Sequence, residues 1–445
     1  MRSKEEIKKS VCEAIDRHRS EIEEIADRIL QNPELGFKEF KTAALVSEVM
    51  EEFSVPHETG LAITGVKGVL EGKNPGPTMA LLGELDSLLV AGHPMADPET
   101  CAAHACGHNG QIAALLGAMM GFVETRAAED CSGRIVFFAV PAEEYVEVEY
   151  RMGLVKEGKL GLMGGKPELV RLGHFDEIDM AMMIHGHVRT DLKKVIMGKS
   201  SNGCVVKLIR FLGKAAHAGN SPHLGINALN AAQIALSAIH AQRETFRDQD
   251  TIRVHPIITR GGDLVNVVPS EVSLETFVRG KTIEAIADAE KKVDRALRAG
   301  ALAIGARVEI QTIPGYMPLA NNNDMVEAFK ANAEAMLGAD EYMDGGHGTG
   351  STDMGDISHI MPAIHPALGG ATGTSHGADY AIMDKELNIL GSAKLMAMTA
   401  IDMLYGDAAK AVDIIENFKP PMTIEEYLAY QKQCFRTELF DGERW

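Results

Sequence analysis

Residues 134 to 144 read Arg-Ile-Val-Phe-Phe-Ala-Val-Pro-Ala-Glu-Glu, and they give the clearest indication of the fold class. The apolar run from Ile135 to Val140 is continuous rather than alternating, which is typical of a strand buried on both faces of a sheet. Pro141 cannot continue the hydrogen-bond ladder, so the strand delivers Glu143 and Glu144 at its carboxyl end, where open α/β sheets bind their ligands. A solvated pair of glutamates in a loop is the alternative interpretation.

Other apolar segments also end in side chains that bind metals or move protons. The segment 78–83 is followed by Glu84-Leu85-Asp86, and the segment 179–184 by His185-Gly186-His187. A glycine-containing loop at 372–376 ends in His376 and follows the apolar region 363–368. This repetition favours a shared site over isolated polar loops. In such a site one carboxylate can bind a metal while its neighbour accepts a proton from water.

The five residues His104-Ala105-Cys106-Gly107-His108 supply a thiol and two imidazoles, the ligands that zinc and related ions prefer. One helical face cannot present both Cys106 and His108, so we expect them on a loop in which Gly107 allows a tight turn. Apolar residues recur at helical spacing from Ile112 to Val123, which predicts an amphipathic helix directly afterwards. The alternative is a buried structural thiol among incidental histidines.

Length and charge limit the classes of protein. A chain of 445 residues with 45% apolar residues predicts two domains, and a net charge of −19 argues against binding to nucleic acid or to an anionic membrane. The acidic start and the lack of a long apolar run predict a cytoplasmic protein. Six scattered cysteines suit reduced thiols, with a Cys101–Cys106 bridge as a minor alternative.

The order of predicted elements indicates an interrupted domain. Strands and helices alternate through residues 1–200, which predicts the first part of a layered α/β domain, and residues 315–418 are assigned to its second part. Between them, residues 201–314 predict a ferredoxin-like α+β insert. Its elements are expected at 205–212 (strand), 227–242 (helix), 251–260 (strand), 272–278 (strand), 283–303 (helix) and 306–313 (strand). Residues 419–445 are predicted to be a C-terminal extension, interpreted as a surface appendage or, alternatively, as a lid or oligomer contact.

Several motifs follow one another in the order seen in the M20 metallopeptidase and amidohydrolase family, which the chain resembles over nearly its whole length. They are Glu84-Leu-Asp86, His104-Ala-Cys-Gly-His108, Pro141-Ala-Glu-Glu144, Gly213-Lys-Ala-Ala-His217-Ala and Gly261-Gly-Asp-Leu-Val-Asn266-Val-Val-Pro269. The chain looks most similar to the branch of aminobenzoyl-glutamate hydrolases, auxin-conjugate hydrolases and aminoacylase-like dipeptidases. The segment 350–356, Gly-Ser-Thr-Asp-Met-Gly-Asp, resembles the aminobenzoyl-glutamate group in particular.

The resemblance implies roles for individual residues. The implied metal ligands are Cys106, His108, Glu144, His185 and His376. Glu143 is implied as general acid and base, Asp86 as the residue that orients a ligand, and Asn266 and Arg279 as substrate-binding residues. The insert is implied to act as a lid and dimerisation domain of a homodimer, in which His217 steadies the oxyanion in the neighbouring subunit's site.

Two departures from the family pattern concern the metal ligands. Many relatives have Asp-x-His after the second histidine of the loop, whereas this chain has Asn109-Gly110-Gln111. His187 competes with His185, which we prefer because it directly ends the apolar run. Arg279 is followed by Gly280 rather than by the residues more familiar after this arginine in the family. His93, His223 and His347 are interpreted as surface or structural histidines.

These observations predict metal-dependent hydrolysis of the amide C–N bond of an N-acyl or N-aroyl amino acid, or of a short peptide-like conjugate. A bound ion lowers the pKa of water from about 15.7 toward about 7, so Glu143 can remove its proton. One or two ions, zinc or manganese, fit the donor types. A hydrolytic deaminase with the same site and a non-catalytic metal-binding relative are the alternative functions.

Overall fold

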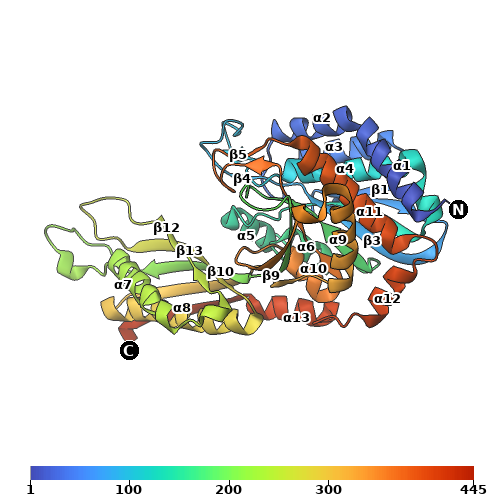
Figure 1. Cartoon of the computed structure of the whole chain (residues 1–445). Helices are drawn as coiled ribbons and strands as arrows, with labels where there is room; N and C mark the ends of the chain where they lie inside the picture. The colour runs from blue at the N-terminus through green and yellow to red at the C-terminus, as the bar shows by residue number, and fades with distance from the viewer. Residues whose placement is uncertain (1, 445) are drawn as a thin grey trace. The chain divides into compact units, whose positions relative to one another are not determined.

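The computed structural model describes residues 2–444 and divides the chain into two compact units (Figure 1). Unit 1 comprises Met1–Ser200, Ala320–His347 and Asp356–Ile424, and unit 2 comprises Ser201–Leu319, Gly348–Gly355 and Glu425–Trp445. The predicted boundary after residue 314 differs from this division. Residues 315–319 stay with unit 2, where the backbone N–H of Cys204 donates to the carbonyl of Tyr316 at 2.7 Å.

Unit 1 is built on a six-stranded mixed sheet with the order β1-β2-β6-β3-β7-β17. Its strands are β1 (His57–Leu61), β2 (Gly65–Glu71), β6 (Ser132–Val140), β3 (Asn74–Glu84), β7 (Met180–Met183) and β17 (Ala363–Ile364). The pairs β6–β3, β3–β7 and β7–β17 are parallel, while β1–β2 and β2–β6 are antiparallel. The predicted layered α/β class is confirmed.

The central position of β6 follows from its sequence. All six residues from Ile135 to Val140 are buried, and the strand lies between β2 and β3 with helices over the sheet. A strand covered on both faces needs apolar side chains on both, which is why the run does not alternate. The ladder ends at Val140, directly before Pro141, as the sequence predicts.

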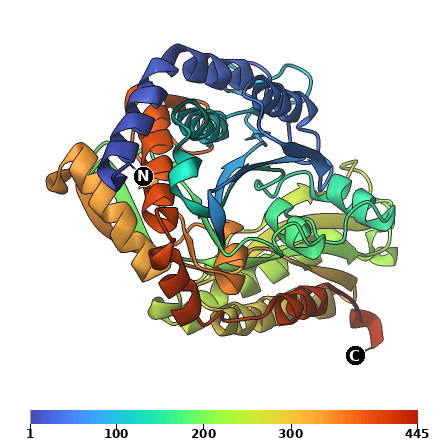
Figure 2. The ribbon, with the colours of Figure 1, turned by 90° about the vertical axis from the view of Figure 1, so that its right-hand side faces the viewer.

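Helix α4 (His108–Thr125) differs in character from the amphipathic helix that the sequence predicts. Its residues are buried continuously from His108 to Phe122, because α1 (Lys4–Arg17), α2 (Arg19–Leu30) and α11 (Ser392–Leu404) all pack around it. Two glycines permit this close packing. A Cβ at Gly117 would lie 2.9 Å from Ile22, and one at Gly121 would lie 2.9 Å from Ile15. Figure 2 shows α1 in blue beside the orange-red α11.

Unit 1 has further helices and strands, most of them short. They include α3 (Phe40–Glu52), α5 (Val148–Lys156), α6 (Gly165–Arg171), α9 (Asn323–Leu337), α10 (Met354–Ile360), α12 (Ala409–Asn417), β4 (Leu88–Leu89), β5 (Ala102–Ala103), β8 (His185–Gly186), β9 (Val195–Ser201), β15 (Leu319–Ala320), β16 (Tyr342–Gly348), β18 (Ala367–Leu368), β19 (Ala371–Thr372) and β20 (Ala381–Ile382). The helical stretch Glu386–Leu404 is long and apolar enough to cross a membrane, but 83% of its most apolar window is buried in the protein. Burial to this extent is typical of a core helix.

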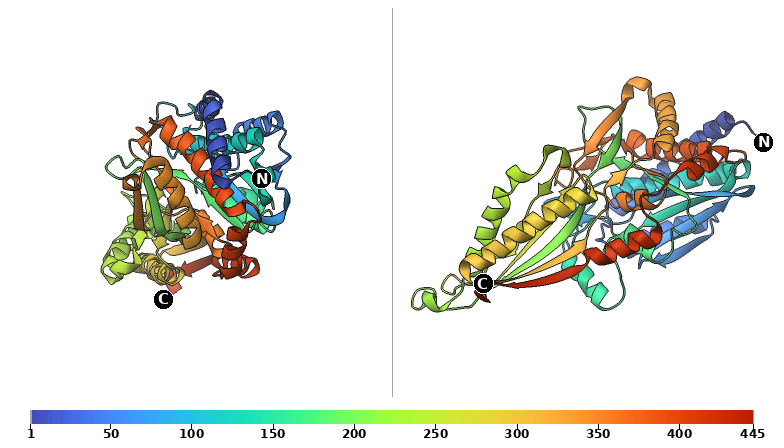
Figure 3. Two further views of the ribbon diagram at one scale, coloured as in Figure 1. Left: turned by 45° about the vertical axis from the view of Figure 1, so that its right-hand side comes forward. Right: turned by 90° about the horizontal axis from the view of Figure 1, so that it is seen from below.

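Unit 2 has the β-α-β-β-α-β order that the sequence predicts. Its elements are β10 (Gly203–Leu212), α7 (Ala228–Ala241), β11 (Arg253–Val254), β12 (Ile257–Arg260), β13 (Glu271–Gly280), α8 (Ile283–Ile304) and β14 (Arg307–Pro314). The predicted strand at 251–260 is two short strands, both paired with β13. Helices α7 and α8 lie together over one face of the antiparallel sheet (Figure 3). The predicted ferredoxin-like arrangement is confirmed.

The C-terminal residues complete this sheet. Strand β21 (Arg436–Asp441) pairs antiparallel with β14 and follows helix α13 (Ile424–Cys434). Arg298 of α8 holds Glu438 at 2.6 Å, and Phe440 packs against the core of unit 2. The segment predicted as an extension therefore supplies an edge strand, because β14 would otherwise expose an unpaired ladder.

Candidate metal centre

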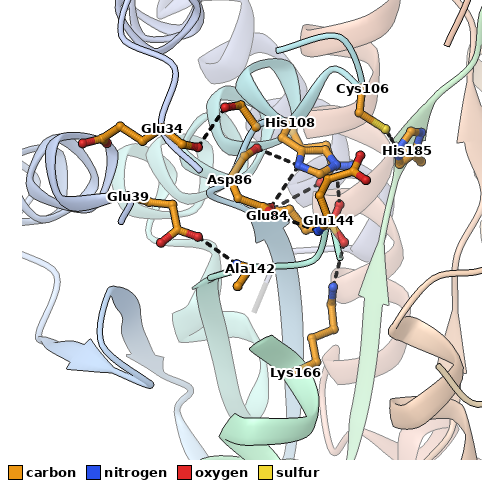
Figure 4. A network of polar contacts seen from close by, with 12 residues as sticks. Glu34, Glu39, Glu84, Asp86, Cys106, His108, Ala142, Glu144, Lys166 and His185 are labelled. Carbon is orange, nitrogen blue, oxygen red and sulfur yellow. Dashed lines mark hydrogen bonds and ion pairs between the residues drawn. The ribbon is translucent and has the colours of Figure 1, made fainter. Parts of the chain in front are cut away.

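The strands of unit 1 bring the predicted site residues to one edge of the sheet. Glu84 is the last residue of β3, Glu143 and Glu144 follow β6, and His185 follows β7. These three strands are parallel neighbours, so their carboxyl ends lie side by side. Figure 4 shows side chains from all three converging on His108.

The loop 104–108 adds the thiol and an imidazole to this edge. Gly107 has a φ of 85°, the left-handed conformation that favours glycine, and a Cβ there would collide with the Tyr380 hydroxyl. The predicted tight turn is confirmed. Cys106 lies in the loop, whereas His108 is the first residue of α4.

Potential ligand atoms gather in three overlapping groups, and the atoms of each group all lie within 4.8 Å of one another. The groups are Cys106 with His108 and His185, Cys106 with Glu144 and His376, and Glu84 with His108 and Glu143. Cys106 Sγ lies 3.3 Å from His185 Nε2, and Glu144 Oε1 lies 3.3 Å from His376 Nε2. The structure thus brings the five predicted ligands together.

His187 lies outside these groups. Its ring contacts the carbonyl of Lys194 at 3.3 Å and accepts a hydrogen bond from the backbone N–H of Arg189. His185 instead points toward Cys106, with its Nδ1 held by the carbonyl of Gly186 at 2.6 Å. A ring held at Nδ1 presents Nε2 to a ligand position, which favours His185 over His187.

Asp86 supports two of the predicted ligands at once. Its carbonyl and Oδ1 lie 2.9 Å and 3.3 Å from His108 Nδ1, and its Oδ2 accepts the backbone N–H of Glu144 at 2.8 Å. Asp86 is fully buried. A carboxylate that fixes the tautomer of a ligating histidine is a common supporting contact of metal sites.

The ionisation of the cluster favours a bound cation. Burial opposes the charged form of Glu144, but the hydrogen bond and charge of His376 outweigh it and lower the pKa to about 2. Burial, with a contribution from Glu144, raises the pKa of the Cys106 thiol well above its ordinary value. Burial alone would lower the pKa of His108, but the Glu84 carboxylate raises it well above its usual range. A cation would replace these protons, because ligands bind metals in their deprotonated forms.

The donor set fits a divalent metal. Glu84 Oε2 and His108 Nε2 are buried 3.1 Å from each other, and the buried Glu144 Oε1 lies 3.3 Å from His376 Nε2, so these potential ligand atoms converge on one another. Buried polar atoms are normally satisfied, so such a convergence indicates a position for an ion. Sulfur, imidazole and carboxylate donors suit zinc and related transition metals.

Sequence reasoning missed Lys166 and His365 and gave Glu84 no role. Lys166 Nζ pairs with Glu84 Oε1 at 2.7 Å and is completely buried. Against the effect of burial, this ammonium lowers the pKa of Glu84 below its ordinary value. The ring of His365 lies 5.9 Å from that of His185, and burial lowers its pKa to about 3. His365 follows β17, a strand of only two residues that gives no clear strand-end signal in the sequence.

Other predicted residues belong to unit 2. His217 is exposed, and its Nδ1 accepts hydrogen bonds from the backbone N–H groups of Gly219 and Asn220. The carbonyl of Asn266 accepts the backbone N–H of Ala218 at 2.9 Å, so His217 and Asn266 lie on paired segments. Arg279 lies on β13 directly opposite Arg253 of β11.

Of the three histidines interpreted as surface or structural, two are partly or fully enclosed. His93 is buried and contacts the carbonyl of Tyr380, and His347 contacts Ser200 at 2.9 Å. His223 is exposed. The six cysteines are free thiols, so the alternative Cys101–Cys106 bridge is not formed in this structure.

The parallel strands of the mixed sheet, their ligand-bearing edge and the paired glutamates define a metal-dependent amidohydrolase. The chain belongs to peptidase family M20/M25/M40, which it matches over residues 81–400. This membership confirms the family that the sequence motifs indicate.

Individual relatives cover most of the chain. The Xaa-Arg dipeptidase of Mus musculus is 27% identical over 90% of each chain. The IAA-amino acid hydrolase ILR1-like 2 of Arabidopsis thaliana is 26% identical over 87% of this chain and 86% of its own. Among solved structures, the YXEP protein of Bacillus subtilis, described as a dinuclear metal-binding peptidase of family M20, has the same fold. It aligns with a TM-score of 0.65 and 20% identity over 87% of this chain and 99% of its own.

Proposed function

We propose that the protein hydrolyses the amide C–N bond of an N-acyl or N-aroyl amino acid, or of a short peptide-like conjugate. The observation that carries this proposal is Glu143, a buried carboxyl next to Glu144 and within 4.8 Å of ligand atoms of Glu84 and His108. A purely structural metal site needs no such neighbouring carboxylate, whereas hydrolysis needs a group that moves a proton.

The proposed centre holds one or two zinc or manganese ions through Cys106, His108, Glu144, His185 and His376. Two of the observed groups share only Cys106, which supports two adjacent positions. A bound divalent ion supplies the Lewis acidity that activates water and polarises the scissile carbonyl. Asp86 keeps His108 and the backbone of Glu144 in place through the contacts described above.

Glu143 is proposed as the proton carrier. It accepts a proton from the attacking water and returns it to the departing nitrogen, which then leaves as a neutral amine. His217, in a homodimer, is proposed to stabilise the oxyanion in the partner subunit's site. Because its Nδ1 accepts two backbone N–H groups, its Nε2 carries the proton and can donate. Leu264 and Val265, exposed by 64% and 104% in the loop next to Asn266, support a protein contact there.

Arg279 and Asn266 are proposed to bind the substrate, with Arg279 holding a carboxylate. A hollow of about 290 Å³ in unit 2 is lined by Arg279, Arg253 and His255, among other residues. Like charges directly opposite on antiparallel strands repel each other, so an anion between Arg253 and Arg279 would be stabilising. The expected compartment is the cytoplasm.

The test is product analysis by mass spectrometry of the metal-loaded protein. The substrates are a mixed panel of N-acyl and N-aroyl amino acids, dipeptides and aromatic amines, and a chelated sample serves as control. Metal-dependent release of an intact amino acid or aryl amine would support the proposal. Ammonia release would favour a deaminase, and no turnover with a filled metal site would favour a binding protein.

A further inference from the structure

Arg151 lies in helix α5, the first helix after the paired glutamates, and its side chain is completely buried. No ion pair joins it to a carboxylate among residues 2–444. Its guanidinium donates instead to peptide carbonyls: Nη1 to Ala142 at 3.3 Å and to Met163 at 2.8 Å, and Nη2 to Glu144. The rings of Phe37 and Tyr145 lie 5.3 Å and 5.4 Å from its central carbon. A buried charge needs such partners, so its position is strictly defined.

The carbonyls of Ala142 and Glu144 flank Glu143. The backbone N–H groups of the same two residues are also held, that of Ala142 by Glu39 Oε1 at 2.8 Å and that of Glu144 by Asp86 Oδ2 at 2.8 Å. Ala142 has a φ of 52°, a left-handed conformation that an alanine rarely adopts. The loop therefore keeps an unfavourable backbone shape by contacts on both sides of Glu143.

Space for the guanidinium depends on Gly36. A Cβ at Gly36 would collide with Arg151 Nη2 and would lie 2.9 Å from the Cβ of Ala142. Both atoms belong to the same set of contacts. A methyl group at position 36 would therefore disturb the arrangement without removing any hydrogen-bonding group.

We propose that Arg151 is a positioning residue that fixes the backbone on both sides of Glu143 and so sets the direction of its carboxylate. This inference rests on the proposed role of Glu143 as the proton carrier. Arg151 touches neither the predicted ligand side chains nor the substrate in this role. It acts through the peptide groups of Ala142 and Glu144.

The main variant is Arg151→Met, which keeps much of the length of the side chain and removes its donors. Ala142 and Glu144 carbonyls retain second donors, the N–H groups of Gly165 at 3.2 Å and of Val146 at 2.9 Å, so we expect the variant to fold. The matched control is Arg134→Met, at the opposite end of strand β6, where Arg134 bonds Thr78 and Glu177.

We expect Arg151→Met to lower kcat about 100-fold with an almost unchanged KM, since a misplacement of about 1 Å costs this much. Metal content and unfolding midpoint should stay close to those of the wild type. Arg151→Lys should recover part of the loss, because an ammonium provides donors for some of the carbonyls. Arg134→Met should keep the wild-type kcat.

A readout independent of turnover is hydrogen–deuterium exchange of peptides that cover residues 140–147. In Arg151→Met these amides should exchange at least about tenfold faster than in the wild type, while the rest of unit 1 is unchanged. Gly36→Ala should produce the same local increase, and it replaces Arg151→Met if that variant does not fold.

Unchanged kcat in Arg151→Met would overturn the proposal. So would a loss of kcat that only follows a loss of folded protein and that Arg151→Lys does not rescue. If the wild type hydrolyses nothing in the panel, the proposed function fails. The hydrogen–deuterium exchange measurement alone then decides whether Arg151 positions the backbone around Glu143. Unaltered exchange at 140–147 would in that case remove the positioning role as well.

Discussion

Replacement of Asp86 by asparagine tests the geometry of the metal centre most directly. Asp86 Oδ2 accepts the backbone N–H of Glu144 at 2.8 Å, and Oδ1 lies 3.3 Å from His108 Nδ1. The backbone N–H of Glu144 is a donor. His108 Nδ1 is also a donor when Nε2 is deprotonated to bind a metal, because the proton of the neutral ring then lies on Nδ1. Asparagine offers one oxygen, so its amide nitrogen must face one of these donors. The backbone carbonyl of residue 86 still lies 2.9 Å from His108 Nδ1, but the carboxylate charge is gone and the support of one ligand is weakened.

The expected magnitude is that of losing a supporting contact in a metal site, about 10- to 100-fold in metal affinity. This corresponds to about 1.4–2.7 kcal/mol of binding free energy. Affinity is measured by competition with a chelator of known strength. Asp179→Asn is the matched control, because Asp179 Oδ2 accepts the single N–H of Thr78 at 2.8 Å near the opposite end of β3, and an amide oxygen can replace it. Wild-type metal affinity in folded Asp86→Asn would refute the reasoning.

Three further predictions concern turnover, pH and the C-terminal strand. Glu143→Gln should retain metal, measured by elemental analysis, and lose about 10²- to 10⁴-fold in kcat on a confirmed substrate; unchanged turnover would remove Glu143 from the mechanism. Burial lowers the pKa of His104 to about 3 from 6.5, so the unfolded chain binds its proton first. The free energy of unfolding should therefore fall as pH drops from 6.5 toward 3, and this group contributes up to about 1.4 kcal/mol per pH unit. Equilibrium unfolding of His104→Gln should show a shallower dependence on pH. The same dependence as in the wild type would contradict the role assigned to His104. Truncation after residue 435 should lower the unfolding midpoint, measured by calorimetry, because β14 loses its edge partner and Phe440 leaves the core; an unchanged midpoint would show that β21 adds no stability.

The edge that carries the candidate site was predictable because long apolar runs fix both the strands and the points where they end. β6 and β7 each stop just before polar side chains, and parallel neighbours bring those side chains together. The position of Gly107 was predictable for a local reason, since Cys106 and His108 cannot share one helical face. In both cases the information lies within a few consecutive residues.

Other contacts depend on partners distant in sequence, and local patterns do not reveal them. Lys166 reaches Glu84 because the start of α6 lies beside the loop after β6, where the N–H of Gly165 donates to the carbonyl of Ala142 at 3.2 Å. No periodicity connects Lys166 with Glu84. His365 follows a two-residue strand that is too short to show a pattern. The sequence predicts an amphipathic helix at α4, whereas the structure buries it on all sides. The difference arises because this burial depends on how closely α1, α2 and α11 approach its glycines, which local spacing does not reveal.

The charges enclosed at this edge of the sheet explain why its polar groups do not simply destabilise unit 1. Five carboxyl groups are buried there, those of Glu39, Glu84, Asp86, Glu143 and Glu144. The buried cationic groups nearby are Lys166, paired with Glu84, Arg151, which bonds only peptide carbonyls, and His108, whose protonated form Glu84 favours. Burial and the nearby Asp86 raise the pKa of Glu39 to about 7, so this carboxyl is partly protonated near neutral pH and relieves part of the excess. When Cys106 and His108 lose the protons that burial and Glu84 favour, the negative charge at this edge needs a new counter-charge, and a divalent cation at the donor atoms of Cys106, His108 and Glu144 supplies it.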